Sequence, residues 1–380
     1  MPTRRPALAP LALAALLGGI LAGACGGAVA SAGAGGDTVY IALAASPAVA
    51  NQAYRNGVRL AIEQLNAARP AGTRPFGLRL QPESLTSQVA VAAAFRDDPR
   101  VIGVVGHTGS GQTLEAAPVY ADLDQGGRRA LVAITPTATN PALTRASEWL
   151  FRVCPTDDDA ARALARFAYD SLRARRAAVI YRNDLFGRGF LRAFALAFER
   201  YGGLVVERDP YLSGLTEFAA YAERIRRREA EVVVLAGANE DAEAVLSSLR
   251  AAGARAAVLG TDDLAALAGR GGAGSAARGV RFISFYLPGQ GPGATARVFD
   301  SLYQARFGTL PDHRAALSYD AARLLGAAVI AVGPDRRRVR EWLAGVGTVT
   351  PPFEGVAGPI RFNVLRNAMN KPVLLGEVGR

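Results

Sequence analysis

The sequence is poor in the side chains that most often carry covalent chemistry or bind metals. It contains two cysteines and two histidines, and Lys371 is its single lysine. A disulfide framework needs paired cysteines, and a structural zinc site needs about four cysteine or histidine ligands. Neither histidine lies in a Gly-x-Ser-x-Gly elbow, and Ser110 is too close to His107 to predict a catalytic triad. We therefore expect no metal, no cofactor and no enzymatic activity.

Positive charge is abundant but almost entirely carried by arginine. The chain has 44 Lys plus Arg against 33 Asp plus Glu, a formal net charge of +11. The arginines are scattered apart from short runs at 226–228 and 336–338, and both runs lie in stretches typical of exposed helix faces. A nucleic-acid surface gathers its basic residues on one face. We expect a solvated surface and no nucleic-acid partner.

The N-terminus carries a targeting signal. Arg4 and Arg5 precede an uncharged, leucine-rich stretch at 7–24, and small residues at 22–24 lead to Cys25. This pattern predicts a secretory signal peptide over 1–25 and an exported, periplasmic or cell-surface protein. Whether export follows the general or the twin-arginine route stays open.

Cys25 after small residues predicts a lipidated cysteine, although Ala22 holds a place where a bacterial lipoprotein signal favours leucine. The predicted anchor attaches the protein to a membrane, and the Gly/Ala-rich stretch at 26–36 would be a flexible tether. The alternative is ordinary cleavage nearby, which leaves a freely soluble secreted protein. If Cys25 is lipidated, Cys154 has no disulfide partner and is expected to be a small core hydrophobe.

From Asp37 onward, apolar runs typical of buried strands alternate with helical patterns. Strands are expected at 39–44, 101–105, 131–135, 177–181, 204–207, 232–236, 256–260 and 280–285. Helices are expected around 58–65, 113–123, 160–172, 190–201, 217–228, 242–249, 295–307 and 316–332, before a β-rich tail. The alternation predicts an α/β fold with two doubly wound parallel-sheet lobes, since one sheet of about ten strands would be unusually large.

In doubly wound sheets, ligands bind at the loops that leave the carboxyl ends of strands. The first such loop, 106–113, is rich in glycine and begins a helix, which favours an anion site that Ser110 completes with its hydroxyl. Gln112 stands where a phosphate-binding loop would carry lysine, which argues against a nucleotide. A plain helix start without a ligand is the other interpretation.

Three further loops follow expected strands. The segment 136–144 holds two prolines and three threonines, and is either an extended ligand-binding segment or a capped turn. Asp262 is placed to hold a ligand cation, whereas Asp263 would cap the next helix. Phe186 is either a wall of the cleft or ordinary packing.

Three stretches resemble one known family. The runs GVRLAIEQLNAA, VVGHTGSGQTLEAAPVY and ITPTATNPALTRASEWLFRVCPTDDDAARALARF are similar to the branched-chain amino-acid binding proteins of ABC transporters, which are type I periplasmic binding proteins. The similarity in order and spacing extends from about Asp37 to the end. It implies an N-terminal lobe at 37–156 and 286–350, a C-terminal lobe at 157–285 and 351–380, and a three-strand hinge. It also implies a monomer that delivers a small ligand, an amino acid or an analogue, to permease subunits.

The resemblance further implies a set of ligand-binding residues. Ser110 and Gly111 would bind the α-carboxylate, Asp262 would pair with the ammonium group, and Phe186 would cover the ligand. The segment after the third expected strand would bind both charged groups through Thr137, Ala138 and Thr139. Two tyrosines of the family pattern are replaced, one near Ala50 and one near Ala238 or Asn239. The side-chain pocket is therefore expected to differ from that of a leucine, isoleucine or valine binder.

One alternative keeps the fold and changes the role. A sensor or regulatory lipoprotein of this fold would bind a ligand or a partner protein without feeding a transporter. A DNA-binding repressor of related fold would need an N-terminal helix-turn-helix, and the signal peptide occupies that place.

Overall fold

A computed structural model describes residues 38–46, 51–237, 239–265, 267 and 277–379. The fold is contained in one compact unit, Asp37–Arg380. The predicted signal peptide, Cys25 and the tether lie outside the described residues.

The first lobe is built on a five-stranded parallel sheet with the order β2-β1-β3-β4-β5. Its strands are β1 Val39–Ala44, β2 Phe76–Leu80, β3 Val101–Gly106, β4 Val132–Thr135 and β5 Leu150–Arg152. The residues of β3 and β4 are buried throughout, as expected for strands covered on both faces.

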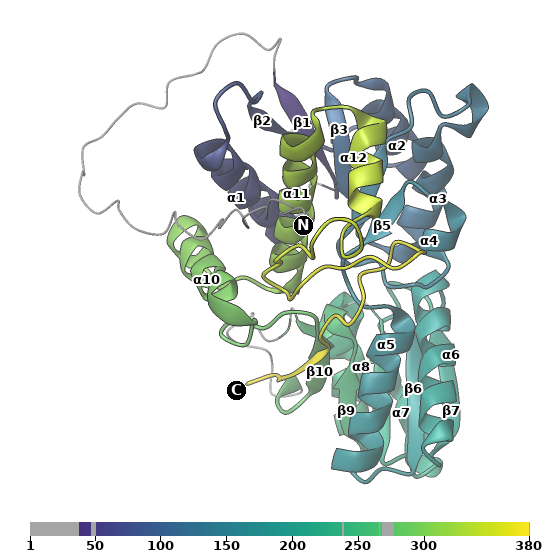
Figure 1. The fold of residues 1–380 in the computed structure, drawn as a ribbon. Coiled ribbons are helices and arrows are strands. Elements are labelled where there is room, and N and C mark those ends of the chain that lie inside the picture. The colour runs from purple at the N-terminus through teal and green to yellow at the C-terminus, as the bar shows by residue number, and fades with distance from the viewer. Residues whose placement is uncertain (1–37, 47–50, 238, 266, 268–276, 380) are drawn as a thin grey trace, which may run out of the picture. The chain divides into compact units, whose positions relative to one another are not determined.

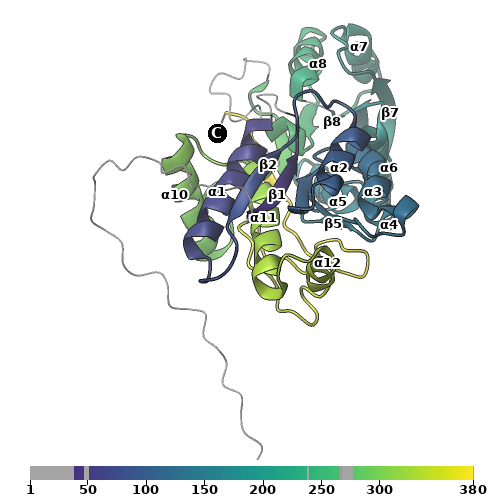
Figure 2. The same ribbon diagram turned by 90° about the horizontal axis from the view of Figure 1, so that it is seen from above.

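Helices cover both faces of this sheet. On one side lie α1 Gln52–Ala68 and α11 His313–Val332, and on the other α2 Gln88–Asp97 and α3 Ser110–Ala121 (Figure 2). The side chains of β1 divide between them: Ile41 and Leu43 join the apolar cluster with α1 and α11, and Ala42 and Ala44 join the cluster with α2 and α3. The short α4 Leu143–Ala146, α10 Gly293–Phe307 and α12 Arg336–Ala344 complete this lobe.

The second lobe is built on a six-stranded sheet with the order β11-β10-β9-β8-β6-β7. Its strands are β6 Arg176–Arg182, β7 Leu204–Tyr211, β8 Val232–Ala236, β9 Ala257–Gly260, β10 Arg281–Ser284 and β11 Leu374–Glu377. All pairings are parallel except that of β10 with the edge strand β11. Its helices are α5 Asp157–Arg166, continued by a π-helical turn to Ser171, α6 Leu185–Arg200, α7 Ala219–Arg227 and α8 Asn239–Ala251 (Figure 1). The predicted fold class, two α/β lobes with parallel sheets, is confirmed.

The chain passes between the lobes three times: from β5 to α5, from β10 to α10, and from α12 to β11. The third passage is not a regular strand. It forms isolated bridges between Phe353 and Ile360 and between Phe362 and Ala368. Within the described part of the expected β-rich tail, up to residue 379, only β11 joins a sheet. The lobe boundaries drawn from the sequence stay a proposal.

α11 is the central helix of the first lobe. Gly57 allows α1 to pack closely against it, since a Cβ there would lie 2.2 Å from the carbonyl oxygen of Ala315. Among the described residues, α11 is the one helix long and apolar enough to cross a membrane, but 72% of its most apolar 18-residue stretch is buried in the protein. It is therefore a core helix. Asp312 caps it by accepting a hydrogen bond from the N–H of Ala315 at 2.9 Å, which fixes the first turn beside the second lobe.

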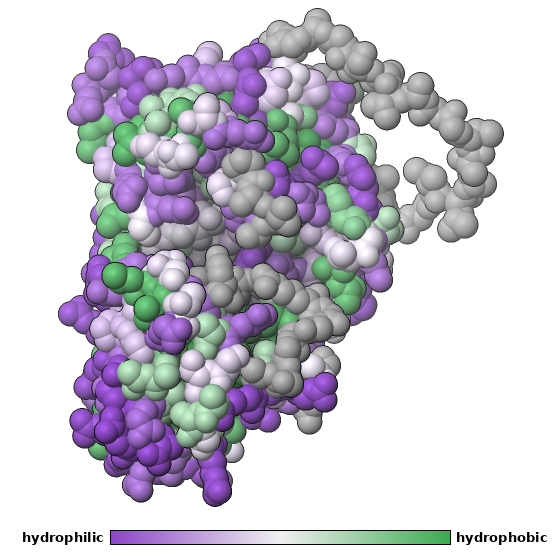
Figure 3. Space-filling model, turned by 180° about the vertical axis from the view of Figure 1, so that it is seen from behind, coloured by the Kyte–Doolittle hydropathy of each residue, from purple (hydrophilic) through white to green (hydrophobic). Residues whose placement is uncertain are grey.

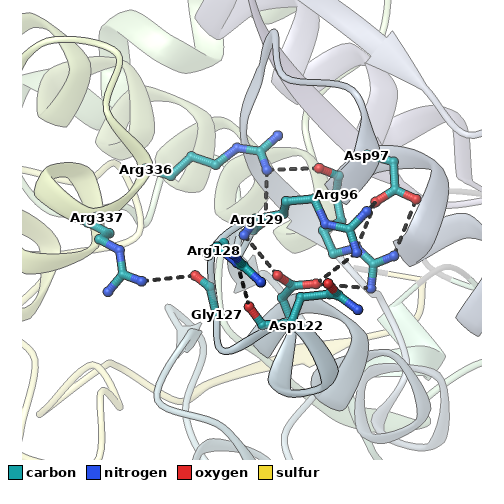
Figure 4. A network of polar contacts seen from close by, with 9 residues as sticks. Arg96, Asp97, Asp122, Gly127, Arg128, Arg129, Arg336 and Arg337 are labelled. Carbon is teal, nitrogen blue, oxygen red and sulfur yellow. Dashed lines mark hydrogen bonds and ion pairs between the residues drawn. The ribbon is translucent and has the colours of Figure 1, made fainter.

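Arginines tie α12 to the first lobe. Figure 4 shows Arg336 reaching the last turn of α2, at Arg96, and the segment before β4, at Arg129. Its guanidinium donates to four backbone carbonyl oxygens within 2.9 Å: Val101, Arg96, Arg129 and Asp98. Nearby, Oδ1 of Asp122, whose side chain is 1% exposed, forms an ion pair with Nη2 of Arg129 at 3.2 Å. Arg336, which the sequence places on an exposed basic face, is therefore hydrogen-bonded within the protein.

Figure 3 shows the face of the molecule that is hidden in Figure 1. This face mixes hydrophilic and apolar residues, and hydrophilic residues gather at its upper and lower edges. The apolar residues in this view are interspersed with polar ones. Such a surface is typical of soluble domains, where single exposed apolar side chains are common.

Candidate functional site

A cavity of about 470 Å³ lies where the carboxyl ends of strands from both lobes meet. The segments after β3, β4, β6 and β9 line it, together with the first turns of α1 and α11. The first-lobe wall is defined here by Tyr54, Ser110, Gly111, Thr137 and Thr139. The second-lobe wall is defined by Arg182, Asp184, Phe186, Asp262 and Asp263.

The glycine-rich loop brings neutral donors to the first-lobe wall. Ser110 is the first residue of α3, and its Oγ accepts a hydrogen bond from the N–H of Asn140 at 3.4 Å. A Cβ built on Gly111 meets no atom within 4 Å, so this backbone faces open space. Gln112 folds back, and its Oε1 accepts from the N–H of Gly109 at 3.2 Å. The start of α3 therefore offers a hydroxyl and a helix N-terminus, which favour an anion without a lysine.

Thr137 connects three segments of the same wall. Its hydroxyl donates to the carbonyl oxygen of Thr108 at 2.8 Å and lies 2.8 Å from the hydroxyl of Tyr54. Since the proton of Thr137 is used by Thr108, Tyr54 is the donor in the second bond. Burial raises the pKa of Tyr54, so the phenol remains a donor at neutral pH. The wall is thus held in place by its own hydrogen bonds.

Arg152 supports this wall from behind and is fully buried. Its Nη1 donates to the carbonyl oxygen of Asn140 at 2.7 Å and to that of Ala138 at 3.3 Å. Its Nε donates to Oδ1 of Asn367 at 3.0 Å, and Asn367 belongs to the third passage between the lobes. One side chain therefore joins the 137–140 segment to the hinge.

The second-lobe wall is charged. Nε of Arg182, the last residue of β6, lies 2.5 Å from Oδ2 of Asp184. Asp184 also caps α6, because its Oδ1 accepts from the N–H of Gly187 at 2.8 Å. Phe186 packs against Phe190 with ring centroids 6.0 Å apart and adds an apolar surface.

The 3-10 turn Asp262–Leu264 faces the first turn of α11 from the other lobe. Oδ2 of Asp262 lies 3.5 Å from Nε2 of His313, and Oδ1 of Asp263 lies 3.6 Å from a guanidinium nitrogen of Arg314. Burial raises the pKa of Asp262 well above its usual range, and the Asp263 carboxylate adds to the rise. Burial lowers the pKa of His313 to about 4. Both shifts favour neutral forms, so the Asp262–His313 contact is not an ion pair at neutral pH.

Most of the residues predicted from the sequence share this cavity. Its walls include Ser110, Gly111, Thr137, Thr139, Phe186 and Asp262. Ala138 is not among the residues lining it: its N–H donates to Oγ1 of Thr135 at 3.0 Å, and its carbonyl oxygen accepts from Arg152. That any of these residues binds a ligand stays a prediction.

Sequence reasoning missed several lining residues, among them Asn51, Tyr54, Glu115, Arg182 and Arg314. Arg182 ends a strand, so the rule used for the other loops applied to it as well. Tyr54 lies on α1, four residues beyond the position near Ala50 where a family tyrosine is replaced. Ala50, Ala238 and the side chain of Asn239 lie outside the described residues.

The remaining chemistry-bearing side chains are part of the core. Nδ1 of His107 bonds with Gln88 at 2.7 Å and Nε2 with the hydroxyl of Tyr120 at 2.9 Å. Cys154 is buried, and burial raises the pKa of its thiol to about 12. In the part of the chain that the structure describes, no group of three or more His, Cys, Asp or Glu is placed to hold a metal ion.

Comparison with known proteins places these features in one family. A family model described as periplasmic binding protein matches residues 39–380. An amino acid binding protein of Pseudomonas aeruginosa is 32% identical over 224 residues, which is 57% of this chain and 58% of that protein. The alignments span about half to three-fifths of the length of the curated relatives.

Solved structures share the fold. A leucine binding protein from Thermotoga maritima superposes with a TM-score of 0.79 at 24% identity, covering 90% of this chain and 95% of that one. A solute binding protein of an ABC transporter from R. palustris, in complex with benzoate, superposes with a TM-score of 0.76 at 20% identity, covering 90% and 93%. At these identities the likeness shows the two-lobed fold.

Proposed function

Because the chain belongs to the periplasmic binding protein family, whose model matches residues 39–380, we propose that it is the extracytoplasmic solute-binding protein of an ABC transporter. Its ligand is an amino acid or a similar small polar molecule, and it delivers that ligand to permease subunits. Leucine and other amino acids are named for several relatives, and benzoate for one protein of the same fold.

One observation carries the proposal: the two walls of the cavity are complementary to the two ends of an α-amino acid. Ser110 and the N-terminus of α3, on the first-lobe side of the cavity, favour a carboxylate. Asp262, in the 3-10 turn after β9, lines the cavity from the second lobe. A carboxyl whose pKa is raised by burial gains an ionised form when an ammonium group arrives. A benzoate-like acid brings no ammonium group and leaves Asp262 without that partner.

The mechanism is closure of the lobes around the ligand. The ligand docks first on the first-lobe wall through Ser110 and Thr139. Asp262 and Phe186 then approach from the second lobe, so that each new contact favours the closed arrangement. Arg152, the last residue of β5, binds the docking segment to the first-lobe sheet, so the docking surface moves as part of the first lobe.

The predicted lipid anchor at Cys25 is part of the proposal, because a tethered binding protein stays close to its permease. It is tested by fractionating cells that express the natural chain or Cys25→Ala. Recovery of the natural chain with membranes and of the variant in the soluble fraction supports lipidation. Equal solubility contradicts it.

The second candidate, a sensor of the same fold, keeps the cavity and drops delivery. Copurification of the protein with a permease, strengthened by ligand, separates the two roles. A partner that is not a membrane transporter would favour the sensor.

Ligand binding is tested with a thermal-shift screen of α-amino acids, short peptides, ureas, amides and small carboxylates. A ligand in excess raises the melting temperature if it binds the folded state only. A hit among α-amino acids supports the assignment. Hits confined to amides or carboxylates would be compatible with a binding protein of this fold, and would contradict the assignment of Asp262 to an ammonium group. No hit with well-folded, ligand-stripped protein moves the assignment to the sensor.

A further inference from the structure

The part of the cavity beyond the head-group residues carries two pairs of opposite charges, besides the exposed Glu115 of α3. Arg182 and Asp184 are in contact at 2.5 Å, and Arg314 and Asp263 at 3.6 Å. All four side chains line the cavity, with side-chain exposures between 12% and 37%. Each pair therefore presents guanidinium N–H donors and carboxylate acceptors side by side.

These pairs make the cavity a poor environment for an aliphatic side chain. Phe186 and Leu185 are its apolar lining residues apart from the ring of Tyr54. Closing the lobes on a leucine or valine side chain would remove water from the charged pairs and replace it with groups that form no hydrogen bonds. Such desolvation costs free energy that aliphatic contacts with two or three side chains do not offset.

A fully charged ligand side chain suits one member of each pair and opposes the other. A carboxylate would bind the arginines and meet Asp184 and Asp263, and an ammonium would do the reverse. A neutral group with both N–H donors and a carbonyl acceptor satisfies an arginine and an aspartate together, without separating their charges.

Building on the proposed function, we propose that the ligand is an α-amino acid whose side chain ends in a neutral carboxamide or ureido group. The carbonyl oxygen accepts from Arg182 or Arg314, and the N–H groups donate to Asp184 or Asp263. Ser110, Thr139 and Asp262 hold the α-carboxylate and ammonium groups. The arginine–aspartate pairs are thus specificity determinants for the side chain.

Isothermal titration of the protein with two sets of α-amino acids tests this. The neutral polar set is asparagine, glutamine and citrulline, and the comparison set is leucine, methionine, glutamate and lysine. The best member of the first set is expected to bind at least tenfold more tightly than every member of the second, because a site built for hydrogen bonds rejects analogues that lack them.

The outcomes separate this inference from the function on which it rests. Equal or tighter binding of any comparison amino acid overturns the side-chain assignment and leaves the binding protein intact. If no amino acid of either set binds, the amino-acid assignment itself fails, and this inference fails with it.

Two substitutions test the Arg182–Asp184 pair directly. Asp184→Asn keeps a side chain that caps α6 and removes one negative charge, so binding should shift at least tenfold toward glutamate. Arg182→Met should lower the affinity for the neutral polar ligand at least tenfold and shift the preference toward lysine. Arg166→Met is the matched control, since Arg166 pairs with Asp170 at 3.3 Å on the exposed surface of the second lobe. An unchanged order of preference in both cavity variants contradicts the role of the pair.

Discussion

The two walls of the cavity differ in chemistry. The first-lobe wall, as defined above, consists of hydroxyls and backbone groups bonded to one another, as in the chain from Tyr54 through Thr137 to Thr108. The charged residues that the first lobe brings to the cavity, Glu115 of α3 and Arg314 of α11, lie outside this set. The second-lobe wall consists of ionisable side chains, with Arg182 against Asp184 and Asp262 facing His313. A neutral, internally bonded wall has its geometry set before a ligand arrives. A charged wall responds to the ligand, so the first can serve for docking and the second for selection and closure.

The largest effect we expect comes from breaking the support of the docking wall. Arg152→Met removes a buried guanidinium and its hydrogen bonds to the carbonyl oxygens of Ala138 and Asn140 and to Oδ1 of Asn367. Each acceptor keeps one further donor: the Cys154 thiol at 3.6 Å, the N–H of Leu143 at 3.3 Å and the hydroxyl of Thr144 at 3.0 Å, respectively. The free energy of unfolding should fall by about 3–5 kcal/mol, because several buried hydrogen bonds from a charged donor are lost together. Chemical denaturation measures this, with Arg166→Met as a surface control. A loss below that of the control would show that Arg152 does not hold the wall.

The next effect is on the charged wall. Asp262→Ala should weaken binding of a zwitterionic amino acid by about 2–4 kcal/mol while the protein stays folded, since the ammonium loses a desolvated partner. Titration calorimetry measures the change. Unchanged affinity would mean that another group, such as Asp263, binds the cation.

Ser110→Ala tests the docking wall with a smaller change. The affinity should fall by about 1–2 kcal/mol, because the backbone donors at the start of α3 remain. A loss as large as that of Asp262→Ala would erase the contrast between the two walls.

pH provides the mildest test, and the group it is aimed at is the Asp262 carboxyl of the second-lobe wall. The pKa of Asp262 is raised, so its carboxyl carries a proton in a pH window between about 3.9, the ordinary value for aspartate, and its raised value. Binding an ammonium favours the ionised form and releases that proton. Affinity should therefore rise with pH across this window, by at most about tenfold per unit, and level off above it.

The same shift makes the folded protein bind more protons than the unfolded chain in that window, so stability without ligand should fall as pH rises. Several other charged or titratable groups act on Asp262: His313, Asp263, Arg314, Asp157 and Cys154. Asp262→Asn serves as the control, because the pH dependence that remains in it belongs to those groups. If Asp262→Asn kept the full pH dependence of the natural protein, the titrating group would be one other than Asp262.

The sequence predicted strands best where both faces are buried. β1 and β8 have the bounds expected from continuous apolar runs. β2, whose residues are mostly half-exposed, was missed, and so was α2. α11 begins three residues earlier than expected because Asp312 is its cap, and an aspartate ahead of an apolar helical run is a start signal in the sequence.

The lining of the cavity was predictable where each residue follows the end of a strand, and not where it comes from a helix of the other lobe. The strand-end rule brought Ser110, Thr139, Phe186 and Asp262 to one cavity. Arg314 reaches Asp263 from another lobe, which depends on how the lobes pack and is not encoded in local spacing.

The burial of Cys154 has a practical consequence. Its thiol is shielded and has a pKa of about 12, so it reacts poorly with thiol-directed dyes. The sequence has one other cysteine, Cys25. In a Cys25→Ser background, a cysteine placed at the exposed Asn183, between Arg182 and Asp184, would be the single reactive thiol. A fluorophore attached there would report the approach of the lobes in real time, which would make the protein a reagentless sensor for its own ligand.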